Sequence, residues 1–358
     1  FAASYGVYAE DPFNLTILGG EYTGTANGIA VTRPEGWATS LGGIIIKNVD
    51  LSGTHQYANT GVGLYLHSSY SNFTNVTARY RQYGLQLYGG GSDAVAIYNN
   101  ISHSDFSNAT TYSIWLDEGS GGYQLGDPNY NLIQYTNMSF AGSYALLIED
   151  GSNNTITTEN TYFGSANGIQ IVQVGGYSFS DHPRGNKIAN VDVSGANQYL
   201  NTGTGLLLQN ARYHNITNVT AKFRQYGARI FDNSDYNNIS HSDFSNATTY
   251  GIFLDDNGDG VPLRNPDYNY IGFSNLTYSA GYGLYAEDAS NLTILRNDFS
   301  YSVNGLRFIV NGNELRHANV SNNTFFNNEW GVIISAGTDN LFYYNNFTNA
   351  SKGFIDTV

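Results

Sequence analysis

Residues 101–112 read ISHSDFSNATTY, and residues 239–250 read the same twelve letters again. The segment TARYRQYG at 77–84 returns as TAKFRQYG at 220–227, and YGVYAEDPFNLTIL at 5–18 returns as YGLYAEDASNLTIL at 282–295. These matches define a long repeat of about 139 residues, with copies at 5–143 and 144–281 and a partial copy at 282–358. Because a solenoid grows by stacking repeats on one another, we predict one continuous domain over 1–358.

A shorter period runs inside each copy. A glycine, usually after Tyr or Asn, precedes an apolar-x-apolar strand, as at Gly63, Gly84 and Gly205; Ser113 and Ala145 fill the same place in two further rungs. Most spacings correspond to one coil of strands and turns, and longer ones indicate loops inserted at fixed places. We therefore predict an all-β fold, a single right-handed parallel β-helix of about 14 coils, with asparagines at tight corners bonding to the next coil.

Composition excludes several classes of protein. The formal net charge is −14 and only 12% of residues are charged, which argues against a nucleic-acid partner that needs a clustered basic surface. The chain has no cysteine, so disulfides and thiolate metal sites are excluded. The sequence holds no apolar run of about 18 residues, so we predict no transmembrane segment.

The last third of the chain carries a family resemblance. Asn297-Asp298-Phe299, Asn323-Thr324-Phe325 and Asn345-Asn346-Phe347 are each followed by a Gly-apolar strand. This pattern resembles the NosD-like repeats of the pectate-lyase-like β-helix superfamily. The resemblance implies the fold, but the superfamily includes polysaccharide lyases, glycosidases, epimerases, tailspikes and surface adhesins, so it implies no single function.

One acidic segment has the spacing of a calcium loop. Asp255-x-Asn257-x-Asp259-Gly260 places three oxygen side chains at alternate positions before a glycine, although the twelfth position is Pro266 rather than Glu. We predict calcium, the single cofactor expected here, at Asp255, Asn257 and Asp259. An acidic, glycine-rich turn without metal is the alternative.

Candidate acids and bases occur at equivalent places in both copies. They are Arg81 with Asp105, repeated as Arg224 with Asp243; Asp117, Glu118, Glu149 and Asp150, repeated as Asp255, Asp256, Glu287 and Asp288; and His103, repeated as His241. Because no single position stands out and catalysis needs one irregular cleft, we assign no catalytic residue. We expect His-Ser-Asp-Phe to form corners with side-chain-to-backbone bonds, and Arg81 and Arg224 to be solvated or paired with aspartate.

Glycosylation sequons are dense, and many recur in both copies. A sequon-rich, cysteine-free, lysine-poor and tyrosine-rich chain resembles the glycosylated proteins of archaeal cell surfaces. We therefore predict N-glycans on surface sequons, above all at Asn108 and Asn246, which lie in serine- and threonine-rich turns just before a strand. The candidate sites are Asn72, Asn75, Asn100, Asn108, Asn137, Asn215, Asn218, Asn238, Asn246, Asn275, Asn322 and Asn349.

These observations favour a non-catalytic extracellular protein of the cell surface, structural or adhesive, such as a subunit of a filament, fibre or surface layer. We see no polar cap at either end, so we expect end-to-end self-assembly or a longer parent chain. Two alternatives stay open. One is a carbohydrate-active enzyme, either a polysaccharide lyase or a glycosidase; the other is a carbohydrate-binding β-helix in which Trp37, Tyr123 or Tyr177 stacks on sugar rings.

Overall fold

The computed structural model describes residues 4–33, 42–53, 61–89, 96–119, 127–157, 159–174, 183–195, 203–255, 265–311, 315–335 and 337–356. It divides the chain into two compact units, Phe1–Lys187 and Ile188–Val358. Every regular element of the described residues is a β-strand, and all the strand pairings given below are parallel. The predicted fold class, an all-β parallel β-helix, is confirmed. The single continuous domain over 1–358 stays a prediction.

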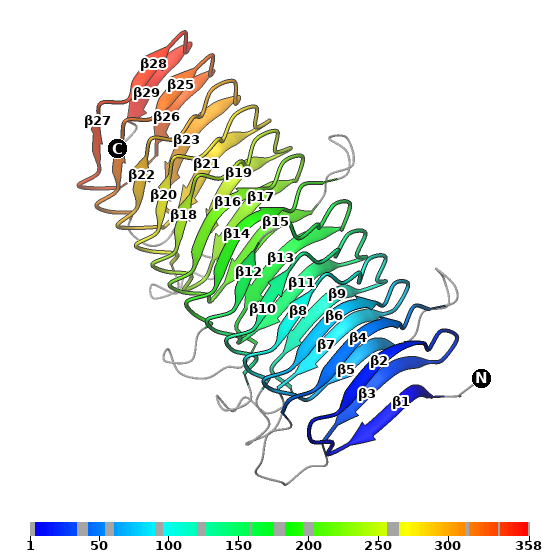
Figure 1. Cartoon of the computed structure of the whole chain (residues 1–358). Helices are drawn as coiled ribbons and strands as arrows, with labels where there is room; N and C mark the ends of the chain where they lie inside the picture. The colour runs from blue at the N-terminus through cyan, green and yellow to red at the C-terminus, as the bar shows by residue number, and fades with distance from the viewer. Residues whose placement is uncertain are drawn as a thin grey trace. The chain divides into compact units, whose positions relative to one another are not determined.

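In the first unit, strands alternate between two parallel sheets. Sheet A has the order β1-β3-β5-β7-β9-β11-β13 and sheet B the order β2-β4-β6-β8-β10-β12 (Figure 1). The strands are β1 (Tyr5–Glu10), β2 (Thr16–Glu21), β3 (Asn27–Thr32), β4 (Ile45–Asp50), β5 (Val62–Leu66), β6 (Asn72–Thr77), β7 (Tyr83–Tyr88), β8 (Asn100–Ser102), β9 (Tyr112–Asp117), β10 (Leu132–Gln134), β11 (Tyr144–Glu149), β12 (Thr155–Thr157) and β13 (Asn167–Val172).

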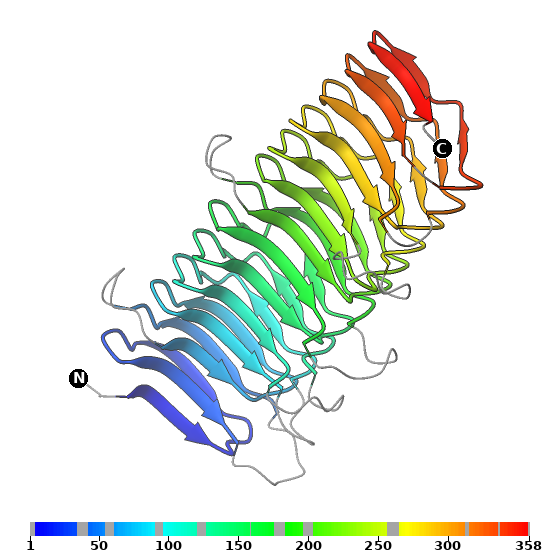
Figure 2. The same ribbon diagram turned by 180° about the vertical axis from the view of Figure 1, so that it is seen from behind.

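The second unit repeats this plan. Sheet A has the order β15-β17-β19-β21-β23-β26-β29, sheet B the order β14-β16-β18-β20-β22-β24-β27, and β25 pairs with β28. Figure 2 shows the strands of this unit, coloured from green to red, from behind. The strands are β14 (Lys187–Asp192), which begins at the last residue of the first unit, β15 (Thr204–Gln209), β16 (Asn215–Thr220), β17 (Tyr226–Phe231), β18 (Asn238–Ser240), β19 (Tyr250–Asp255), β20 (Tyr270–Gly272), β21 (Tyr282–Glu287), β22 (Thr293–Leu295), β23 (Asn304–Ile309), β24 (Asn319–Ser321), β25 (Thr324–Phe326), β26 (Trp330–Ile334), β27 (Leu341–Tyr343), β28 (Asn346–Thr348) and β29 (Lys352–Asp356).

The core consists of inward residues that stack from coil to coil. In sheet A of the first unit, Leu64, Leu85, Ile114 and Leu146 occupy one register position, and all four are fully buried. Successive side chains of a strand point to opposite faces. This apolar column faces inward, so on each strand the residues directly before and after its member face outward. The outward residues of sheet A are therefore the ones available for function.

The glycine of each rung is required by close packing. A Cβ on Gly84 would lie 2.6 Å from both the Phe106 Cβ and the Ser113 carbonyl oxygen. Ser113 itself fits at the next rung because its hydroxyl donates to the Met138 carbonyl at 3.1 Å. The glycines of the rung pattern thus mark positions where a side chain would collide with the neighbouring coil.

The corners contain the predicted asparagine ladder. The backbone N–H and Nδ2 of Asn99 both donate to Asn131 Oδ1, and those of Asn131 both donate to Asn154 Oδ1, at 2.8–3.1 Å. All three residues are buried. These bonds satisfy amide groups that would otherwise be buried without partners at the turn.

Candidate functional site on the outer face of sheet A

Two of the predicted acidic residues meet on the outer face of sheet A in the first unit. Asp117 ends β9 and Glu149 ends the neighbouring β11, and each carboxyl group shifts the pKa of the other. Gln86 Nε2 donates to Asp117 Oδ2 at 2.6 Å, and the Trp115 indole nitrogen donates to Glu149 Oε2 at 2.9 Å. The backbone N–H of Gly119 donates to Asp117 Oδ1 at 2.8 Å.

Aromatic rings surround this pair of carboxyl groups. The Trp115 ring centroid lies 5.1 Å from that of Tyr83 and 5.6 Å from that of Tyr112. The same face carries Tyr65 and His67, whose hydroxyl and Nε2 are 2.9 Å apart. Burial and, secondarily, the nearby Arg33 lower the pKa of His67 to about 4. The imidazole is therefore uncharged at neutral pH.

Glu149 holds a proton near neutral pH. Burial raises the pKa of Glu149 to about 7, helped by the negative charge of Asp117 and opposed by the bond from Trp115. Burial also raises the pKa of Asp117, against the bonds from Gly119 and Gln86. Two carboxyl groups in contact titrate as a pair, and the second proton leaves with difficulty. The site thus offers one carboxyl donor and one carboxylate acceptor side by side.

The second unit has the same acids with different partners. Asp255 and Glu287 are the equivalents of Asp117 and Glu149, but Arg229 stands where the first copy has Gln86 and forms an ion pair with Asp255. The Arg229 guanidinium also lies 4.6 Å from the Phe231 ring centroid. Asn311 Nδ2 donates to Glu287 Oε1 at 2.7 Å. The two copies therefore differ in charge at this face, although the acidic residues themselves repeat.

The predicted arginine–aspartate pairs do not form. Arg81 is 2% exposed and donates to the carbonyl oxygens of Leu51 at 2.6 Å and Thr25 at 2.7 Å. Arg224 is buried in the same way and donates to Val193 O at 2.8 Å. The expectation that these arginines are solvated or paired with aspartate was wrong, because each long side chain reaches inward to cap backbone carbonyls.

The aspartates of the identical repeat instead pair with other cations. Asp243 is 2.8 Å from Lys222, and Asp105 is 3.9 Å from Arg79. Asp105 Oδ1 also accepts the N–H of Ser107 at 3.0 Å, which confirms the predicted side-chain-to-backbone corner. His103 is stacked on Tyr135 at 4.8 Å, a ring contact within the same corner region.

The predicted calcium site is described only in part. Asn257 and Asp259 lie outside the described residues, as do Asp256, Trp37, Tyr123 and Tyr177. Asp255 is 7% exposed and already bonds Arg229. Among the described residues, no group of three or more His, Asp or Glu side chains is placed to hold a metal ion. Calcium at Asp255, Asn257 and Asp259 stays a prediction.

The candidate sequon asparagines are a different set from the buried corner asparagines. All twelve are at least partly exposed. The more exposed ones are Asn75, Asn215, Asn218, Asn238, Asn322 and Asn349. Asn100 directly follows the buried Asn99, and Asn238 follows the buried Asn237. The structure therefore leaves every candidate accessible at the surface, and their occupancy stays a prediction.

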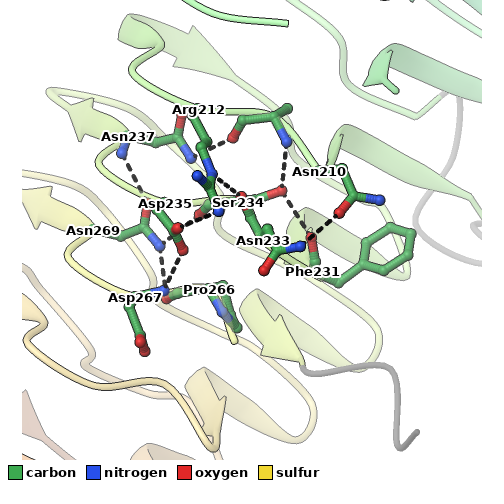
Figure 3. Close-up of polar contacts among 11 residues, drawn as sticks. Asn210, Arg212, Phe231, Asn233, Ser234, Asp235, Asn237, Pro266, Asp267 and Asn269 are labelled. Atoms are coloured by element: carbon green, nitrogen blue, oxygen red, sulfur yellow. Dashed lines mark hydrogen bonds and ion pairs between the residues drawn. The ribbon is translucent and has the colours of Figure 1, made fainter. Parts of the chain in front are cut away.

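A polar network in the second unit escaped the sequence analysis. Arg212 Nη2 is 3.0 Å from Asp235 Oδ2, and the N–H of Asp267 donates to Asp235 Oδ1 at 2.9 Å (Figure 3). Burial raises the pKa of Asp267 to about 6, opposed by its bond from Ser290 and helped by the charge of Asp235. The first copy has Ser69, Ile97 and Asn129 at the positions of Arg212, Asp235 and Asp267.

This network lies at positions where the aligned copies differ. The sequence-based predictions rested on positions where the copies are identical, so they did not include it. Its bonds run to neighbouring side chains and backbone of adjacent corners, such as Arg212 Nε to the Asn233 carbonyl at 2.9 Å. Asn269 Nδ2 continues the network to the Ser234 carbonyl at 2.9 Å (Figure 3). We assign it to holding the corner together.

No helix long and apolar enough to cross a membrane occurs in the part of the chain that the structure describes. A family model described as "Periplasmic copper-binding protein (NosD)" matches residues 254–357. This match covers 104 of the 358 residues, less than a third of the chain. No curated protein matches the chain.

Solved structures with a similar fold cover nearly all of the chain at low identity. The periplasmic alginate epimerase AlgG is 12% identical over 98% of this chain and 78% of its own, with a TM-score of 0.57. The A-module of mannuronan C-5 epimerase AlgE4 from Azotobacter vinelandii is 12% identical over 95% and 88%, with a TM-score of 0.52. The catalytic unit of a GH87 α-1,3-glucanase from Streptomyces thermodiastaticus is 10% identical over 98% and 62%, with a TM-score of 0.58. At these identities the likeness shows the fold alone.

Proposed function

We propose that this chain is an extracellular, non-catalytic β-helix that binds a neutral glycan on the outer face of sheet A in its first unit. The observation that carries the proposal is the carboxyl pair of Asp117 and Glu149 beside the Trp115 indole and the rings of Tyr83 and Tyr112. Sugars present hydroxyl groups and apolar C–H faces together. A donor, an acceptor and aromatic rings at one place complement both.

The charge of the site selects among glycans. The charged groups that raise the pKa of Glu149 are the carboxylates of Asp117 and Glu118, and the chain carries a net charge of −14. A polyuronate would bring further carboxylates to this face, and like charges repel. The three similar structures carry names of enzymes that act on polysaccharides, which supports a carbohydrate ligand without naming it.

The separation of the two carboxyl groups favours binding over hydrolysis. Glycosidases hold their two carboxyl groups ~5–10 Å apart, so that one lies on each side of the scissile bond. Asp117 and Glu149 end neighbouring strands on one face and each shifts the pKa of the other, so we take them to act as one proton-holding unit rather than on two sides of a scissile bond. A surface role as an adhesive protein or a filament subunit, including end-to-end self-assembly, is part of the same proposal.

The test is calorimetric titration with maltohexaose, mannohexaose, xylohexaose, chitohexaose and oligomannuronate. We expect binding of at least one neutral hexasaccharide, no binding of oligomannuronate, and a loss of about fivefold or more for Trp115→Ala, since one aromatic contact contributes ~1 kcal/mol. Phe13→Ala, which removes a ring that is 76% exposed elsewhere in the same unit, serves as the control. Release of reducing ends by the wild type, abolished in Glu149→Gln, would replace this proposal with an enzyme.

A further inference from the structure

A second surface feature lies in the second unit, along the row of corners that follows β20 and β22. It is a groove of about 420 Å³ lined by Phe273, Asn275, Tyr278, Arg296, Asp298 and Tyr301, with Ser274 and Thr277. Asn275 and Asp298, both in its lining, form a parallel β-bridge between neighbouring coils. Its volume falls within the range of ~300–1,000 Å³ that small-ligand sites occupy.

The two walls of the groove are built from rings and a cation. On one side Tyr278 and Tyr301 are stacked with centroids 4.8 Å apart and planes 3° from parallel, and they are 54% and 45% exposed. On the other side the Arg296 guanidinium lies over the Phe273 ring, 5.4 Å from its centroid. Because the tyrosines face each other, their edges and hydroxyl groups remain available to a ligand.

Polar groups in the groove have unused bonding capacity. Within the described residues, no carboxylate lies within 4 Å of the Arg296 guanidinium. Asp298 Oδ1 accepts bonds from the N–H and the hydroxyl of Ser300, while no described residue donates to Oδ2. A guanidinium is a rigid set of donors and a carboxylate oxygen is a strong acceptor, so together they suit adjacent hydroxyl groups.

The first unit lacks this combination. Its sequence has Glu159 where the second unit has Arg296, Thr161 where it has Asp298, and Gly164 where it has Tyr301. The bridge Asn137–Thr161 takes the place of Asn275–Asp298, and Phe140 meets Phe163 edge to face at 88°. The groove is therefore a property of the second unit rather than a by-product of the repeat.

We infer that this groove binds one pyranose residue of a neutral glycan, an inference that rests on the proposed function and adds a second site to it. Asp298 Oδ2 accepts a bond from one sugar hydroxyl, Arg296 donates to its neighbour, and the tyrosine hydroxyl groups bond others. The opposite charges of Arg296 and Asp298 balance, which favours a neutral sugar over an acidic one. Asn275 is also a sequon, so protein from a host without N-glycosylation keeps the groove uncovered.

The experiment is calorimetric titration of the wild type, Arg296→Gln, Tyr301→Ala and Trp115→Ala with the same four neutral hexasaccharides. Tyr344→Ala is the control, since it removes a ring that is 81% exposed in the same unit but outside the groove. We expect two binding events in the wild type. Arg296→Gln and Tyr301→Ala each weaken one of them tenfold or more, and Trp115→Ala weakens only the other; unchanged circular dichroism shows that the variants fold.

The outcomes separate the two claims. If Trp115→Ala abolishes all binding and Arg296→Gln binds like the wild type, the groove is not a site and the proposed function stands. If Arg296→Gln abolishes all binding and Trp115→Ala does not weaken it, the groove stands and the site at Asp117 and Glu149 is wrong. If the wild type binds none of the four hexasaccharides, both are overturned. Tighter binding of oligomannuronate that Arg296→Gln removes would overturn the assignment to a neutral sugar.

Discussion

Gln86 and Arg229 occupy the same position in the two copies, and each donates to the aspartate on the neighbouring strand, Asp117 and Asp255 respectively. The first aspartate keeps a carboxyl partner, Glu149, and the second has an arginine partner. One substitution between copies thus separates a proton-holding site from an ion pair on otherwise equivalent strands. This divergence gives the first unit a chemistry that the repeat alone does not contain.

The stability of the protein should fall with rising pH through the titration of Glu149. Its pKa is raised in the folded state from 4.5 to about 7, so the folded protein binds this proton more tightly than the unfolded chain. The resulting stabilisation is fully present below about pH 4.5 and is lost as the pH rises through about 7. We expect Glu149→Gln to have a higher urea midpoint than the wild type at pH 8 and a smaller difference at pH 5.

Glu159→Gln is the matched control for that measurement, because Glu159 is an exposed glutamate of the same unit. Its urea midpoint should track the wild type at both pH values. A gain in Glu149→Gln that is equal at pH 5 and pH 8 would show that the carboxyl proton is not its cause.

Arg81 should be worth far more to stability than its neighbour Arg79. The Arg81 side chain is buried and donates to four backbone carbonyls, those of Leu51, Thr25, Ala26 and Ser52. Each buried acceptor left without a donor costs ~1–3 kcal/mol, so Arg81→Leu should lower the free energy of unfolding by about 3 kcal/mol or more. Denaturant unfolding measures this directly.

The control is Arg79→Leu, since Arg79 is partly exposed and meets Asp105 only at 3.9 Å. A surface ion pair contributes ~0–1 kcal/mol, so this change should be small. Equal losses for the two variants would mean that the carbonyl bonds of Arg81 are replaced by water at little cost.

The sequence predicted the fold well because the rung pattern and the core share one period. Gly84 and its equivalents mark each coil, and the asparagine ladder through Asn99 and Asn131 was expected from composition and position. The role of Arg81 was missed, because an arginine that caps carbonyls of other coils looks like a solvated one in a one-dimensional pattern. Its partners lie 30 and 56 residues away, across loops whose lengths hide the register.

The sequence identified the acidic residues of the site but not the neighbours that determine their chemistry. Asp117 and Glu149 were both candidates, but the equivalent acids Asp255 and Glu287 argued against a single catalytic position. What distinguishes them is Gln86 against Arg229, a difference on a neighbouring strand that becomes visible only when coils are stacked in register. The same reasoning explains the groove at Arg296 and Asp298, which also arises where the copies differ.

Calcium binding remains to be tested at the segment that begins at Asp255. If the ion binds there, it competes with Arg229 for the Asp255 carboxylate, so we expect weak binding that strengthens in Arg229→Gln. Calorimetry on the wild type, Arg229→Gln and the double variant Asp255→Ala/Asp259→Ala measures this. Calcium binding that the double variant leaves unchanged would place the ion elsewhere.

N-glycans should be found on the exposed sequons of the native protein, above all at Asn215 and Asn238. Both side chains are exposed and point outward from the start of β16 and β18, next to the exposed rings of Tyr213 and Tyr236.

Asn108 and Asn246 are less exposed, and their Nδ2 atoms donate to Ser107 and Ser245 hydroxyls at 3.1 and 3.0 Å. Asn238 Nδ2 also donates, to Asn215 Oδ1 at 3.2 Å, but both of these side chains are exposed. Because of this exposure we expect occupancy at Asn215 and Asn238 to exceed that at Asn108 and Asn246, the reverse of the order that the sequence predicted. Peptide mass spectrometry of protein from its native source gives occupancy site by site. Bare peptides at Asn215 and Asn238 in secreted material would rule these sites out, and full occupancy at Asn108 with none at Asn215 would show that exposure in the folded state does not decide it.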